Sequence, residues 1–256
     1  MPKESHTPSQ VRPHLLHRLE LAMSDYRHVD GIWIGNRGSS AEDLTRVEGA
    51  LSLIKRHSPL DYARIIRELD RIWVNLSHHG LGEYRHSLKA CILDERYVAD
   101  PATTVEQIAS TIVHEATHAR IERYGIKYKE ELRTRIEAIC FRRELAFAAR
   151  LPNGAELQQS IERYLEFYQS NPDQFSDAQF QEWDAAGGIE ALRYLGTPDW
   201  LARATLIPKS MIGRLKRWSP ILALAASVPL VIVFGLTYAF AAILNPKTYS
   251  KSKPTE

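Results

Sequence analysis

An uncharged apolar stretch near one end of this chain, residues 219–244, has few stable environments. It reads SPILALAASVPLVIVFGLTYAFAAIL and carries no charged side chain over 26 positions. A helix of that length reaches about 39 Å, enough to cross the hydrocarbon core of a membrane with some tilt. A buried core helix is the alternative, but such helices rarely run so long without a polar face. We therefore predict one transmembrane helix over residues 219–244.

The charges on either side of this stretch do not decide its orientation. Four basic residues precede it and three follow it, so the positive-inside comparison nearly ties. The polar N-terminus lacks the apolar core of a signal peptide, and twelve residues follow the span. Because this arrangement resembles a tail-anchored protein, we expect a single-pass membrane protein whose N-terminal part is cytoplasmic.

The composition of the whole chain is ordinary for a folded globular protein. Hydrophobic residues make up 44% of the chain and charged residues 25%. A net charge of +2 and the lack of a nucleic-acid-binding motif predict no nucleic-acid partner. Cys91 and Cys140 form no disulfide framework and are expected to be small core residues. We divide the chain into a disordered lead-in (1–18), a folded domain (19–208), a basic juxtamembrane segment (209–218), the transmembrane helix (219–244) and a short polar tail (245–256).

Hydrophobic periodicity predicts several helices and few strands in the folded domain. Residues 84–100 are rich in Ile, Val, Leu and Tyr, which indicates one or two strands. The predicted fold class is therefore α+β, predominantly helical with a small sheet. The predicted helices cover residues 41–57, 59–73, 104–124, 129–150 and 155–207, the last with breaks at 171–172, 187–188 and 197–198.

The helix that ends before Gly125 contains the pattern His-Glu-x-x-His, formed by His114, Glu115 and His118. Residues four apart on a helix differ by about 40° in azimuth and about 6 Å in height, so both imidazoles point the same way and one metal ion can bridge them. Glu115 lies about 100° around the helix, where it can hold a metal-bound water. Zinc suits such a site because it accepts imidazole nitrogen and lowers the pKa of bound water. A polar stripe facing solvent is the alternative.

A third ligand must come from elsewhere in the chain. The metzincin form needs Gly and His where Ile121 and Tyr124 stand, so that form is excluded. Glu137 follows His118 after eighteen intervening residues, and the pattern resembles the gluzincin branch of the zincin metallopeptidases. The resemblance covers residues 84–150 and implies a zincin-like domain. It also implies that His114, His118 and Glu137 bind zinc.

The same resemblance implies that Glu115 is the general base. It also implies that the strand within residues 88–98, LKACILDERYV, is an edge of the sheet that binds extended peptide. Relatives of the thermolysin type carry Asn before the ligand Glu and an acidic residue about four positions after it. Here those positions are Ile136 and Phe141, and Glu144, on nearly the same helical stripe as Glu137, stays the second candidate for the third ligand. The group that stabilises the transition state stays open among three residues: Tyr124, Tyr128 and His86.

These observations predict a membrane-anchored, Zn²⁺-dependent metallopeptidase. Its partners would be a peptide or protein substrate and a membrane bound through residues 219–244. The alternative is a catalytically silent zincin-fold protein that acts as a membrane-tethered regulator or binding module. An intact Glu115 favours the enzyme, because a silent site is free to lose its base.

Overall fold

The computed structural model describes residues 20–37, 40–78 and 80–204, and the chain divides into two compact units after Phe180. No helix in the described residues is long and apolar enough to cross a membrane. The predicted lead-in, juxtamembrane segment, transmembrane helix and polar tail lie outside the described residues. Their predictions therefore stay predictions.

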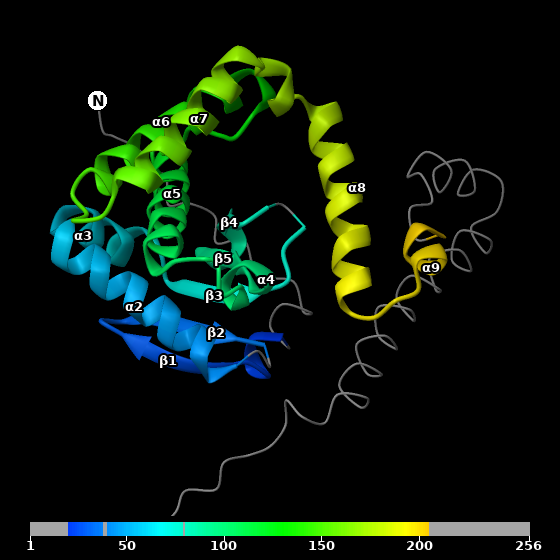
Figure 1. Ribbon diagram of the computed structural model, residues 1–256, viewed down its shortest axis with the longest axis horizontal. Coiled ribbons are helices and arrows are strands. Elements are labelled where there is room, and N and C mark those ends of the chain that lie inside the picture. The colour runs from blue at the N-terminus through cyan, green and yellow to red at the C-terminus, as the bar shows by residue number, and fades with distance from the viewer. Residues whose placement is uncertain (1–19, 38–39, 79, 205–256) are drawn as a thin grey trace, which may run out of the picture. The chain divides into compact units, whose positions relative to one another are not determined.

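The first unit contains a mixed sheet of five strands among its described residues (Figure 1). The strand order is β1-β2-β3-β5-β4, with β2, β3 and β5 parallel and both edge strands antiparallel to their neighbours. Strand β4 is therefore an edge of the sheet. The prediction that residues 88–98 form that edge is wrong, because the strand within them, β5, pairs with β3 on one side and with β4 on the other. The strands are β1 (Asp25–Val29), β2 (Ile32–Asn36), β3 (Arg71–Asn75), β4 (Gly82–Arg85) and β5 (Ala90–Asp94).

Helices dominate the described residues, so the α+β class is confirmed. The helices of the first unit are α2 (Ala41–His57), α3 (Pro59–Glu68), α4 (Glu95–Ala99), α5 (Val105–Arg123), α6 (Glu130–Ala148) and α7 (Ala155–Ser170). Two 3₁₀ turns, His86–Leu88 and Pro172–Phe175, lie between them. Helix α8 (Asp177–Tyr194) crosses the division between the units, and α9 (Asp199–Ala204) follows in the second.

Helix α5 is the central helix of the first unit. It packs against α2, α3 and α6 and against strands β4 and β5 (Figure 1). Its start is fixed by a capping box in which the Thr104 hydroxyl accepts from the Gln107 backbone N–H and the Gln107 side chain accepts in return. Ile108 and Ile112 are fully buried in one cluster with Cys91 of β5. The core therefore holds α5 firmly against the sheet.

Two predictions about secondary structure are wrong, and two of the strands were not predicted. The helix after Pro59 ends at Glu68, and the residues that follow form the central strand β3. Trp73 packs on one face of the sheet while its neighbours Ile72 and Val74 pack on the other, so the run is apolar throughout and imitates a helix. Strands β1 and β2 were not predicted, and α8 continues through Gly187 and Gly188. The prediction of one or two strands within 84–100 is confirmed by the end of β4 and by β5. The segment nevertheless ends as helix α4, because the Asp94 side chain accepts from two backbone N–H groups there.

Candidate metal centre

His114 and His118 of α5 point to a common place between α5 and α6. Their Nε2 atoms lie 3.1 Å apart. Both rings are largely buried. Burying two polar imidazoles is costly unless they have partners, so their burial indicates that they bind something together. The pair that the helical spacing predicted is thus brought together in the structure.

Glu137 of α6 completes the group from the other helix. One carboxylate oxygen lies 3.1 Å from His114 Nε2, and the other lies 3.2 Å from His118 Nε2. Donor atoms at about 2.1 Å from a tetrahedral zinc are roughly 3.4 Å from one another, so these separations are close to those of a zinc site. The predicted set of two histidines and Glu137 therefore converges on one point.

Glu144 lies on the opposite side of the His114 ring. Its Oε1 contacts His114 Nδ1, and its Oε2 accepts a hydrogen bond of 2.7 Å from the Ser110 hydroxyl. A ligating histidine usually has its other ring nitrogen held in this way, which fixes the tautomer and the ring orientation. The structure places Glu144 where it can orient His114, while Glu137 faces the Nε2 atoms.

Cys140 also faces the centre, and the sequence analysis missed it. Its sulfur and one ring nitrogen from each of His114 and His118 lie within 4.8 Å of one another, and the side chain is fully buried. The sequence pattern that could have identified it is the spacing of Glu137, Cys140 and Glu144, which places all three on one face of α6. Nitrogen, carboxylate and thiol donors all suit zinc. The group contains one donor more than a catalytic zinc with three protein ligands requires.

Glu115 is buried beside the two histidines, under the edge strand β4. A Cβ atom built on Gly82 of β4 would lie 3.3 Å from Glu115 Oε1, so the carboxylate packs against the strand backbone. Burial raises the pKa of Glu115, although the nearby His118 and His114 act to lower it. A carboxyl group with a raised pKa holds a proton more readily than an exposed one, which suits a group that takes up and releases a proton during a reaction.

The metal-free donors are strongly coupled to one another. Burial alone would raise the pKa of Glu137, but His118 and His114 outweigh it and hold that pKa well below its usual range. Burial alone would lower the pKa of His118, but Cys140 and Glu137 outweigh it and raise that pKa to about 10. Without metal, a protonated imidazole therefore neutralises the buried carboxylate.

Of the three candidates for stabilising a transition state, Tyr128 alone contacts the donors. Its hydroxyl donates a 2.6 Å hydrogen bond to Glu137 Oε1, and its ring lies edge-on to His118 with centroids 5.4 Å apart. Tyr124 is 64% exposed at the end of α5, and His86 is paired with Glu122. The geometry therefore favours Tyr128 for any role beside the centre.

No protein-family model, curated protein or solved structure matches this chain.

Proposed function

We propose that this protein is a zinc-dependent metallopeptidase that is anchored in a membrane. The observation that carries the proposal is the Glu137 carboxylate, which contacts the Nε2 atoms of both His114 and His118 while a buried Glu115 lies alongside. In this proposal His114, His118 and Glu137 bind Zn²⁺, and Glu115 is the general base. Bound zinc supplies a Lewis acid and lowers the pKa of water held at the site.

The protein's own residues supply proton transfer and positioning. Glu115 takes a proton from the attacking water and passes it to the leaving amine of the scissile peptide bond. Its burial and raised pKa support both halves of that exchange. Glu144 holds His114 in the orientation that keeps Nε2 directed at the centre.

The surroundings of Glu115 support a peptide as the substrate class. Strand β4 is the last strand of the described sheet, and no described strand pairs with its outer edge. An extended peptide can add to such an edge through main-chain hydrogen bonds. Since Glu115 lies directly under β4 at Gly82, a peptide on that edge would run close to the general base.

A second candidate function is a catalytically silent, membrane-tethered regulator or binding module. It is favoured by Cys140, whose sulfur is near both histidines. Zinc sites with four protein ligands are closed and structural, whereas catalytic sites keep one position for water or substrate. If Cys140 bound the metal together with the other three donors, the centre would have no such position.

The experiment that tests the proposal measures metal content and peptide hydrolysis on the purified full chain. We expect about one zinc per chain by mass spectrometry and none in His114→Ala. Glu115→Gln should keep the zinc but lose turnover of a peptide library by roughly 10²- to 10⁴-fold. Full activity in Glu115→Gln would overturn the mechanism, and zinc without hydrolysis of any peptide would favour the binding module.

A further inference from the structure

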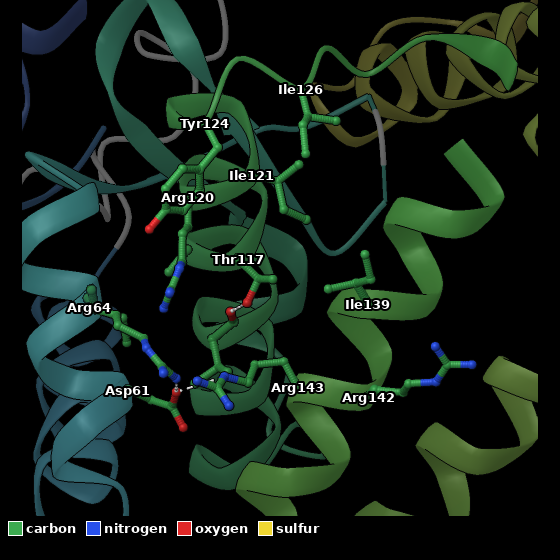
Figure 2. A pocket seen from close by; sticks show the side chains of 13 residues that line it. Asp61, Arg64, Thr117, Arg120, Ile121, Tyr124, Ile126, Ile139, Arg142 and Arg143 are labelled. Carbon is green, nitrogen blue, oxygen red and sulfur yellow. Dashed lines mark hydrogen bonds and ion pairs between the residues drawn. The ribbon is translucent and has the colours of Figure 1, made fainter. Parts of the chain in front are cut away.

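A second feature of the first unit is a cavity of about 430 Å³ between α3, α5 and α6 (Figure 2). None of the four donor residues of the metal centre lines it. Small and aliphatic side chains of α5, including Val113 and Ala116, are part of its lining. The cavity is therefore a feature that the proposed reaction does not use.

One end of the cavity carries excess positive charge. Asp61 is buried, and its carboxylate lies 2.8 Å from Arg64 and 2.9 Å from Arg143, both of which line the cavity. It also lies 3.3 Å from Arg150, which is outside the lining. One carboxylate can neutralise only one of these three guanidinium groups. Arg120 points along the cavity toward Arg64 in Figure 2, and no described carboxylate pairs with it. The single negative charge of Asp61 therefore does not balance the positive charges of the arginines around it.

The other end of the cavity is apolar and open to solvent. Ile121, Ile126 and Ile139 lie around it in Figure 2. Ile126 is 46% exposed and Ile139 is 41% exposed. Clustered exposed aliphatic side chains of this kind are typical of a binding surface.

We propose that this cavity binds a small amphiphilic anion, with its carboxylate or phosphate head at Arg64, Arg120 and Arg143 and its aliphatic chain along the isoleucines. Guanidinium groups form charge-assisted and often bidentate hydrogen bonds with such heads. The volume lies within the range of about 300–1,000 Å³ that is usual for small-molecule sites, which favours a free small ligand over a membrane surface. This site is independent of the proposed metal chemistry.

The test is isothermal titration calorimetry on the full chain in nanodiscs of zwitterionic phospholipid, with empty nanodiscs subtracted. The probe is octanoate, and acetate and octanol supply the head alone and the chain alone. We expect octanoate to bind at least about tenfold more tightly than either, because the head and the chain contact opposite ends of the cavity. Equal affinity for acetate and octanoate would overturn the proposal, as would equal affinity for octanol.

Variants locate the binding. Arg120→Glu should weaken octanoate binding by about tenfold or more, and Arg120→Gln should weaken it by less. Ile139→Asp, at the apolar end, should weaken it by about as much as Arg120→Glu. Arg135→Glu is the matched control, since Arg135 is exposed on α6 and does not line the cavity. Circular dichroism and zinc content should be unchanged in every variant, which separates this result from failure of the metal centre.

If wild type, Arg120→Glu and Ile139→Asp bound octanoate with the same affinity, the binding site would lie elsewhere and the proposal that the cavity binds the anion would be refuted. Binding to nanodiscs of anionic phospholipid without any binding of octanoate would assign the arginines to a membrane surface instead.

Discussion

His114 is held at both of its ring nitrogens, by Glu137 at Nε2 and by Glu144 at Nδ1. We expect Glu144→Ala to weaken zinc binding by roughly 10- to 100-fold while one zinc still binds at saturation, because only the orientation of the ring is lost. Glu137→Ala should lose the metal under the same conditions. The measurement is competition with a chelator, read by mass spectrometry. The opposite ranking of the two variants would make Glu144 the ligand and Glu137 the supporting group.

Cys140 decides between the two candidate functions. In the proposed enzyme the cobalt-substituted protein should show no thiolate-to-cobalt charge-transfer band, and Cys140→Ser should leave its spectrum unchanged. The reason is that the Glu137 oxygens are 3.1 and 3.2 Å from the histidine nitrogens, and they complete the set of three ligands. A charge-transfer band that disappears in Cys140→Ser would show a closed centre and favour the binding module.

The pair formed by His118 and Glu137 gives the metal-free protein a defined pH dependence. The pKa of His118 is raised from 6.5 to about 10, so its contribution to stability is complete below pH 6.5 and is lost as the pH rises through about 10. The pKa of Glu137 is lowered from 4.5, so its contribution is present above pH 4.5 and is lost as the pH falls.

We therefore expect the difference in Tm between wild type and Glu137→Gln, measured with chelator present, to be largest between pH 4.5 and 6.5 and to shrink toward pH 10. Differential scanning fluorimetry across that range is the measurement. A difference that stays constant with pH is the result that contradicts the pairing.

At the scale of residues, the sequence predicted what helix geometry alone controls. His114 and His118 converge because residues four apart share a helical face, wherever the helix is placed. The positions of Cys140 and Glu144 depend on how α6 packs against α5, which no local pattern encodes. The sequence placed Glu144 on the stripe of Glu137 but predicted Cys140 as a small core residue, and only tertiary packing shows that this stripe faces the histidines.

The contact between α5 and β4 is the element-scale feature that covers the general base. A Cβ at Gly82 would lie 2.6 Å from Thr111 Cγ2, so Gly82→Ala must move β4 or α5. We expect a lower Tm and a lower kcat/KM, because the strand that covers Glu115 is displaced. Gly49→Ala in α2 is the control, since its Cβ would meet Val105 at an ordinary 3.5 Å and a helical alanine is favoured over glycine. Unchanged kcat/KM in Gly82→Ala would mean that β4 has no part in the reaction.

Among the elements, α2 and α5 were predictable because their starts carry strong local signals. Ser40 caps α2, and Thr104 with Gln107 forms the capping box of α5. Strand β3 was not predictable in the same way, because a strand buried on both faces lacks the alternation that distinguishes a strand from a helix.

At the scale of the whole molecule, the prediction from residues 219–244 is membrane attachment. We expect the full chain to sediment with membranes after a high-salt wash, and a chain lacking residues 219–244 to stay in the supernatant, because loss of 26 uncharged residues removes the apolar span. Protease added to intact cells or spheroplasts should leave the N-terminal part uncut if it is cytoplasmic. Digestion of that part from outside would reverse the orientation.

Because its donors come from both α5 and α6, a metal ion at the centre would add a link between two helices that already pack against each other. Ligand binding to the native state adds about 2.7 kcal/mol to stability at a hundred times the dissociation constant. The amount of folded protein in a cell would then follow the supply of zinc. A starved cell would lose the protein to proteolysis as well as its activity, so abundance itself would report the cell's metal status.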